Sequence, residues 1–356
     1  MKMIKVVYRR FAILSIFPML LFAPLKSMPI KGEFDLSFSS SQTKVSELQT
    51  QRQDRIDRGL ELLESKKYVE ARAFFNLVLD DNPEDDEALL CMGKICFFEN
   101  DFKSAIVWIE KAVNIEPDDS DYHYWLARAN EQQFQEASII TKMKYGKKFR
   151  NEIKRAVALD GNNLDARFWL MRFYLTSPKS FGGNWDSTLV QAAIIKKMDP
   201  EYGYHAYIEV YQKAKMFDKV ERELRQRSAN FSDKIEYQID LSWFLIDHSR
   251  HIEAIQNSAE IIKSHPDAWI SYFQIGRAAA ESKTQLELGK GYLEKYIKNE
   301  PSASLPFIEW AHFYLGQIFE ADGNFKNAQS EYLKALESQP DFKVAIDAMK
   351  NLKDNN

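Results

Sequence analysis

Residues 86–119 have the sequence DEALLCMGKICFFENDFKSAIVWIEKAVNIEPDD, and they repeat a pattern already present in residues 52–85. The two copies have the same length, and Pro83 and Pro117 occupy the same position in them. In each copy a glycine precedes the proline at a fixed offset and an alanine precedes it at half that offset; these are Gly59 and Ala71, then Gly93 and Ala105. A fixed period of this kind indicates that one small structural unit recurs along the chain.

Other matching positions define the unit more closely, since Tyr68 matches Phe102 and Phe75 matches Ile109. The second copy has a small residue at position 8, alanine at 20, a large residue at 24, a small residue at 27 and proline at 32, namely Gly93, Ala105, Ile109, Ala112 and Pro117. This pattern resembles the tetratricopeptide repeat family. The resemblance implies a unit of two antiparallel helices that stacks on its neighbours to form a superhelix.

The pattern continues to the C-terminus with irregular copies in the middle. The offset from the small residue to the proline recurs from Ala254 to Pro266 and, with glycine in place of alanine, from Gly289 to Pro301. The last copy has most of the signature, at Leu315, Gly316, Phe319, Phe325, Ala328, Tyr332, Ala335 and Pro340. We therefore expect about eight hairpins over residues 52–340, and a capping helix over residues 341–356 to cover the last apolar face.

The fold class that follows is all-α, because no segment shows the alternation of a run of strands. We expect a superhelical solenoid of stacked antiparallel helix pairs. The signature is weakest around residues 200–235. A hinge between two arms of the solenoid is a hypothesis for this window.

The N-terminal segment indicates export. Lys2, Lys5, Arg9 and Arg10 precede the apolar run 11–23, which is short for a transmembrane helix. Residues 1–27 are predicted to be a signal peptide or an N-terminal anchor of an exported, periplasmic protein. The sequence leaves open whether the segment is removed; if it is retained, residues 11–23 anchor the chain to an inner membrane and provide its membrane contact. Residues 28–51 are predicted to be a flexible linker.

Composition is that of an ordinary polar surface. The net charge is −4 with 28% charged residues, and no block of like charge suggests nucleic-acid binding. The acidic stretch Asp80–Asp86 favours a solvated turn over a calcium loop, because the glycine and ligand spacing of such loops are absent. Cys91 and Cys96 point to different sides of one helix, which favours buried thiols over a disulfide.

The sequence has none of the common catalytic or nucleotide-binding motifs. The chain has no G-x-S-x-G, H-E-x-x-H, G-x-x-x-x-G-K-[ST] or G-x-G-x-x-G pattern, and its six histidines are dispersed. We therefore predict no enzyme, no cofactor and no metal site. The most unusual segment is 176–187, with Gly182, Gly183 and Trp185. It favours a long hairpin turn in which Asp186 or Ser187 caps the next helix, with contact to a partner as the alternative.

The family resemblance also implies where a partner binds. In the family, positions 2, 5, 9, 12 and 13 of the first helix reach a bound peptide. At positions 5 and 9 this chain has an apolar or aromatic residue one turn before a cation in four repeats, as Leu90 and Lys94, Tyr124 and Arg128, Phe168 and Arg172, and Phe273 and Arg277. Such pairs share one helix face, which predicts a groove with an aromatic floor and a ladder of positive charge. The alternative is that these arginines pair with carboxylates of neighbouring helices and the rings pack.

The sequence therefore predicts a non-catalytic scaffold of the cell envelope that binds a peptide segment of a protein partner. The predicted contact residues are Lys94, Tyr124, Arg128, Phe168, Arg172, Phe273 and Arg277. The alternative is an accessory binding module of an envelope enzyme or of a polysaccharide or secretion system. In that case the segment 176–187 is the contact.

Overall fold

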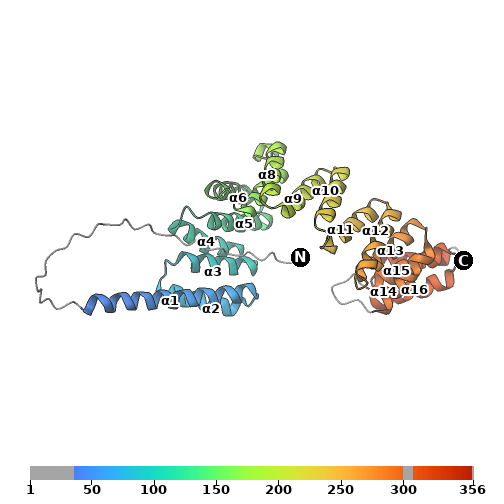
Figure 1. Cartoon of the computed structure of the whole chain (residues 1–356), viewed down its shortest axis with the longest axis horizontal. Helices are drawn as coiled ribbons and strands as arrows, with labels where there is room; N and C mark the ends of the chain where they lie inside the picture. Colours follow the sequence, from blue (N-terminus) through green and yellow to red (C-terminus); the bar gives the residue numbers. More distant parts are fainter. Residues whose placement is uncertain (1–35, 300–307, 355–356) are drawn as a thin grey trace, which may run out of the picture.

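Within the residues that the computed structural model describes, 36–299 and 308–354, all regular structure is helical. The predicted signal or anchor, residues 1–27, lies outside them. The helices pair into eight antiparallel hairpins followed by one closing helix (Figure 1), which confirms the predicted all-α solenoid. The hairpins are α1 (Leu36–Glu64) with α2 (Tyr68–Asp81), α3 (Asp86–Phe98) with α4 (Phe102–Ile115), α5 (Ser120–Glu136) with α6 (Ile139–Leu159), α7 (Leu164–Thr176) with α8 (Trp185–Met198), α9 (Pro200–Lys213) with α10 (Phe217–Asn230), α11 (Ile235–Asp247) with α12 (His251–Ser264), α13 (Trp269–Ser282) with α14 (Leu286–Lys298), and α15 (Ile308–Ala321) with α16 (Phe325–Ser338); α17 (Lys343–Asp354) closes the array.

Short acidic and amide side chains begin many of these helices. The carboxylate of Asp85 accepts a hydrogen bond from the amide of Ala88 at 3.0 Å at the start of α3, and Asp101 accepts one from Ser104 at 3.1 Å at the start of α4. Such caps satisfy backbone donors that have no partner within the helix. The acidic stretch around Asp85 is thus partly a helix cap, and Asp85 itself is buried and paired with Arg52 at 2.8 Å rather than solvated.

Close packing inside each hairpin depends on the small residue at position 8. A Cβ atom added to Gly93 would lie 2.4 Å from Cγ1 of Ile109, and one added to Gly316 would lie 2.5 Å from Cε1 of Tyr332. These contacts are far shorter than van der Waals separation. The glycines therefore let the two helices of a hairpin approach each other closely.

Most hairpins turn through one residue in the left-handed conformation, which few side chains adopt readily. In six hairpins such a residue lies within two positions of the end of the first helix: Lys66, Asn100, Lys215, Ser249, Lys283 and Gly323. The first two are separated by one repeat length, and so are the third and fourth and the fourth and fifth. The residue type varies, so the sequence pattern does not reveal this position. The α5–α6 turn lacks it, and the longer α7–α8 turn has its left-handed residue, Gly182, further from the end of the first helix; both turns belong to the irregular copies.

The first helices of successive hairpins contact one another directly, from α1 to α3 and onward to α9, and again from α11 to α15. We call these odd-numbered helices the inner row, because helices on the concave side of a curved stack lie closest together. The array follows an arch in Figure 1, with α8 and α9 near its top. Between α9 and α11 the direct contact is small, and α10 joins them.

The structure differs from the sequence-based expectations in two further places. The linker predicted for residues 28–51 is helical from Leu36 onward, since residues 36–51 contain no proline or glycine to stop α1. Helix α8 is capped by Asn184, whose side chain accepts from the amide of Ser187 at 2.7 Å, and not by Asp186 or Ser187. Cys91 and Cys96 are free and buried, as predicted.

Candidate functional site

The seven predicted contact residues all lie on the inner row, in two separate groups. Lys94 is on α3, Tyr124 and Arg128 are on α5, Phe168 and Arg172 are on α7, and Phe273 and Arg277 are on α13. Three consecutive hairpins thus hold the first group. The α13 pair lies beyond α9 and α11, so the residues do not form one unbroken row.

Each of the four cations lies over an aromatic ring. The distance from Lys94 Nζ to the Trp125 ring centre is 5.0 Å. The guanidinium carbon of Arg128 lies 3.8 Å from the Trp169 ring centre, and that of Arg172 lies 4.5 Å from the same ring. Arg277 lies 5.5 Å from the Trp243 ring centre on α11. These cation–π contacts hold the charged groups on the walls of the inner row.

Two of the four cations, Arg172 and Arg277, form ion pairs, and the other two do not form any among the described residues. Arg172 contacts Glu209 of α9 at 2.7 Å. Arg277 contacts Asp247 of α11 at 2.9 Å and Glu281 of its own helix at 2.7 Å. For these two arginines the structure shows the pairing with neighbouring helices that the alternative interpretation expected.

Lys94 and Arg128 make no ion pair among the described residues. Arg128 donates from Nη1 to the hydroxyl of Tyr124 at 3.3 Å, and its buried Nε has no hydrogen-bond partner there. A buried donor without a partner is costly. Of the four cations, Lys94 and Arg128 are therefore the best placed to interact with a polar group of a bound molecule.

Two carboxylates that the sequence analysis did not single out face these cations. Asp121 and Asp165 lie three residues before Tyr124 and Phe168, at position 2 of their repeats, and that position was the available signal. Burial raises the pKa of Asp121, although the charge of Lys94 opposes the shift. Asp165 is exposed at the surface, yet the protein around its carboxylate partly excludes water, and this desolvation raises the pKa of Asp165 as well. The predicted ladder of positive charge therefore alternates with carboxylates.

The predicted aromatic residues are buried more deeply than a binding floor requires. Tyr124 and Phe273 are buried, and Phe168 packs against Tyr202 with ring centres 4.9 Å apart. The rings that stay partly accessible along the inner row include Trp125, Trp169, Trp243 and Trp310, together with Phe97, Tyr202 and Tyr207.

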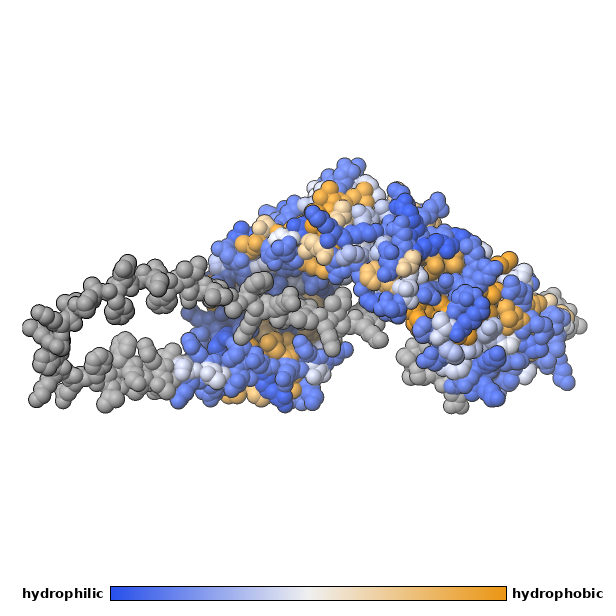
Figure 2. Space-filling view, in the orientation of Figure 1, coloured by the Kyte–Doolittle hydropathy of each residue, from blue (hydrophilic) through white to orange (hydrophobic). Residues whose placement is uncertain are grey.

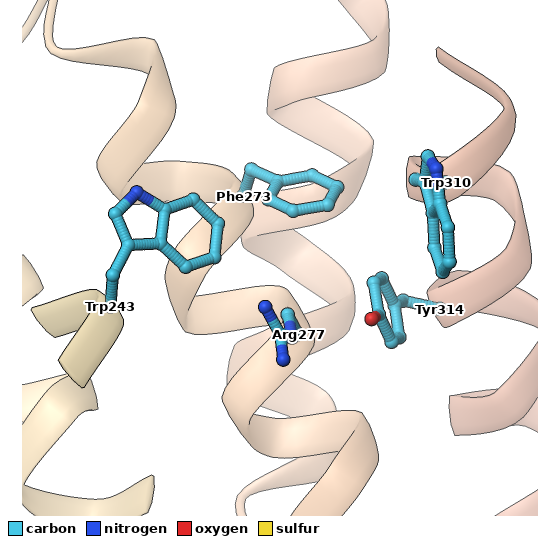
Figure 3. Close-up of a pocket in the computed structure, with 5 residues that line it drawn as sticks. All are labelled: Trp243, Phe273, Arg277, Trp310 and Tyr314. Atoms are coloured by element: carbon cyan, nitrogen blue, oxygen red, sulfur yellow. The ribbon is translucent and has the colours of Figure 1, made fainter. Parts of the chain in front are cut away.

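A pocket of about 270 Å³ on the inner row is lined by Trp243, Phe273, Arg277, Trp310 and Tyr314. Its walls come from α11, α13 and α15, and Arg277 lies between Trp243 and Tyr314 (Figure 3). The Trp310 and Tyr314 rings stack with centres 5.8 Å apart. We call it the α13 pocket; it combines flat apolar walls with one charge-neutralised guanidinium.

A family model of the tetratricopeptide repeat matches residues 62–129, and a second model of this family matches residues 311–342. This chain contains tetratricopeptide repeats. The matched stretches contain the copies in which the period and signature residues are most complete. No curated protein matches the sequence of this tetratricopeptide-repeat protein.

Solved structures similar to this tetratricopeptide-repeat protein have low sequence identity. TTC0263, a thermophilic tetratricopeptide-repeat protein of Thermus thermophilus, is 15% identical, with 55% of this chain and 98% of that one covered and a TM-score of 0.46. Yeast Tom70 is 18% identical, with 82% and 59% covered and a TM-score of 0.49. A tetratricopeptide repeat protein of Parabacteroides merdae is 11% identical, with 85% and 99% covered and a TM-score of 0.39.

Tetratricopeptide-repeat proteins are typically non-catalytic scaffolds that bind protein or peptide partners. In the described part of this tetratricopeptide-repeat protein, no helix is long and apolar enough to cross a membrane. The same residues contain no group of three or more His, Cys, Asp or Glu side chains that could hold a metal ion.

Proposed function

We propose that this protein is a non-catalytic scaffold of the cell envelope that binds an extended segment of a partner protein along the inner row. The α13 pocket is the observation that carries the proposal. It is concave, it is lined mainly by aromatic rings, and it contains one guanidinium, which is the composition expected of an anchoring site.

The charges around the pocket favour a particular kind of segment. Arg277 uses Nε for Glu281 and one Nη for Asp247, while Nη1 donates to no described residue. A backbone carbonyl of the bound segment can accept from Nη1. Because two carboxylates already neutralise Arg277, an uncharged aromatic or aliphatic side chain fits the pocket better than an acidic one.

The first group of contact residues supplies the charges for the rest of the segment. Lys94 and Arg128 lack ion-pair partners among the described residues and can receive a carboxylate, while Asp121 and Asp165 can receive a lysine or arginine. A peptide with mixed charges next to an apolar anchor is therefore the proposed ligand class.

The envelope location rests on the N-terminal sequence. Lys2, Lys5, Arg9 and Arg10 before the apolar residues 11–23 support export to a periplasm, with retention at the inner membrane if the segment is not removed.

A crosslinking pull-down from the native envelope tests the function, followed by an array of short peptides from the captured partner. We compare the full chain with the double variant Trp243→Ala, Arg277→Gln and with Phe325→Ala, an exposed aromatic residue of α16, as the control. Binding of one partner peptide should weaken at least about tenfold in the double variant alone, since anchoring residues each contribute above about 1 kcal/mol. Equal peptide binding by all three chains, with thermal unfolding unchanged, would refute the α13 pocket as the anchor.

The alternative is an accessory binding module that uses the segment 176–187. Phe181 and Trp185 of this segment are 50% and 38% exposed, which is unusual for large apolar residues beside a short 3-10 helix (η1, Lys179–Phe181). Loss of the partner in Phe181→Ser, Trp185→Ser, together with its retention by the α13 pocket variant, would favour this function.

A further inference from the structure

Helix α6 differs in charge from the rest of the chain. Its sequence, IITKMKYGKKFRNEIKRAVAL, contains seven lysine and arginine residues and one glutamate, whereas the whole chain has a net charge of −4. It is also 21 residues long, while the neighbouring second helices α4 and α8 have 14 each. A long basic helix on an acidic protein is typical of a surface that binds a negatively charged partner.

Few of these cations are neutralised within the protein. Lys148 contacts Glu110 at 2.5 Å and Arg155 contacts Asp118 at 2.6 Å. The single carboxylate of α6, Glu152, is occupied by His123 at 2.6 Å. No ion pair within the described ranges involves the other five, which are Lys142, Lys144, Lys147, Arg150 and Lys154.

The unpaired charges lie mainly on one outward face, together with two apolar residues. Lys144, Lys147 and Lys154 are exposed, and their spacing of three and seven residues places them on the same side of the helix. Ile140 and Met143 precede them on that side and are 90% and 67% exposed. We call Ile140, Met143, Lys144, Lys147 and Lys154 the α6 face; it contains no carboxylate.

The segment 176–187 adds apolar surface beside this helix. A Cβ atom added to Gly182 would lie 3.9 Å from Cδ of Arg150, so the turn after η1 lies against α6. Phe181, the residue before this glycine, is half exposed. In Figure 2 apolar residues form separate patches within a largely polar surface along the array.

We propose that the α6 face binds the surface of an anionic lipid bilayer. The lysines would lie among lipid phosphates, and Ile140 and Met143 would enter the boundary between headgroups and acyl chains. A nucleic acid or an acidic protein surface would neutralise the lysines but would leave these two apolar side chains without an apolar environment. An anionic bilayer provides both, and an amphipathic basic helix binds it through the same two contributions.

The proposed membrane site is independent of peptide binding on the inner row. Helix α6 is the second helix of its hairpin, and none of its residues lines the α13 pocket. The scaffold could therefore hold a partner while its α6 face lies on a membrane. Failure of either proposal leaves the other standing.

Cosedimentation of the full chain with vesicles tests the proposal. Vesicles of phosphatidylcholine are compared with vesicles in which about one third of the lipid is phosphatidylglycerol. The test variant is Lys144→Glu, Lys147→Glu, Lys154→Glu. The control variant is Lys103→Glu, Lys326→Glu, Lys343→Glu, which makes the same change in net charge at exposed lysines in the first turns of α4, α16 and α17.

We expect the wild type and the control to prefer anionic vesicles and the test variant to bind them at least about tenfold more weakly, because each lysine near such a surface contributes roughly fivefold. Ile140→Ser, Met143→Ser should also weaken binding while keeping the preference for anionic lipid. Residues 11–23 are unchanged in all variants, so their own lipid affinity cancels. Equal losses in test and control, or a loss of RNA binding in the test variant without a loss of vesicle binding, would overturn the proposal.

Discussion

At the residue scale, the glycine at position 8 determines how closely the two helices of a hairpin pack. Gly93 lies against Ile109, and Gly316 lies against Tyr332, in each case the large residue at position 24 of the same copy. Replacing a hydrogen atom by a methyl group forces the partner side chain, or the helix that carries it, to move. The small and large signature residues are therefore two sides of one contact.

Two glycine-to-alanine substitutions distinguish this contact from ordinary helix propensity. We expect Gly93→Ala to lower the free energy of unfolding by about 1–3 kcal/mol, because the new Cβ overpacks against Ile109. Gly291→Ala, in α14, meets no atom within 4 Å and should raise it by about 0.5–1 kcal/mol. Urea unfolding of both variants measures the difference. Similar effects of the two substitutions would show that the position-8 contact is not tight.

At the element scale, a buried histidine joins the two helices of the α5–α6 hairpin. His123 contacts the carboxylate of Glu152 through Nδ1 at 2.6 Å and the carbonyl of Pro117 through Nε2 at 2.9 Å. Both partners are acceptors, so both ring nitrogens donate and the ring is an imidazolium. The hydrogen bond to Glu152, opposed by burial, raises the pKa of His123 above its ordinary value of 6.5.

This geometry predicts a pH-dependent stability. Since the folded state binds the proton of His123 more tightly, the pair stabilises the protein fully below the unfolded pKa, and this contribution is lost as pH rises through the higher folded pKa. The difference in unfolding free energy between wild type and Glu152→Gln should therefore be largest well below about pH 6.5 and should shrink as the pH rises above it. Glu136→Gln, at an exposed position of α5, serves as the control. A difference that stays constant with pH would contradict a charged His123.

At the scale of the whole molecule, the inner row is weakest between α9 and α11. These helices make little direct contact and are linked through α10. The link is partly polar, because the guanidinium of Arg227, only 3% exposed, contacts Asp240 of α11 at 2.6 Å. Lys234 likewise contacts Glu201 of α9 at 2.5 Å. The hinge hypothesis for residues 200–235 concerns this same region.

Limited proteolysis tests the hinge together with its polar link. We expect the first internal cut within residues 200–235, and faster cleavage there in Asp240→Asn, since buried Arg227 then loses its carboxylate at a cost of about 1–2 kcal/mol. Cleavage within residues 86–119 is the internal reference. Asp233→Asn, an exposed neighbour, is the matched substitution and should leave the rate unchanged. Absence of a cut in the window, or equal acceleration by both substitutions, would count against the hinge.

Much of the fold was predictable because its determinants are local. Glycine, alanine, the large residue and proline of one repeat fall within a single copy, and a contact such as Gly93 with Ile109 closes inside one hairpin. The left-handed turn residue was not predictable, since Lys215 and Ser249 adopt the same conformation with different side chains. The helical start at Leu36 was missed because a polar segment without glycine or proline is compatible with both helix and linker.

The sequence by itself determined the repeat unit, the all-α class and the helix face on which Lys94, Arg128 and Arg277 lie. Only the tertiary structure decided what those cations meet: Arg277 finds Asp247 from the preceding hairpin, while Lys94 and Arg128 find rings and, among the described residues, no ion-pair partner. The α13 pocket likewise needs side chains from three hairpins. The physical reason is that contacts between repeats depend on the rotation of each hairpin on the next, which a pattern within one repeat unit does not specify.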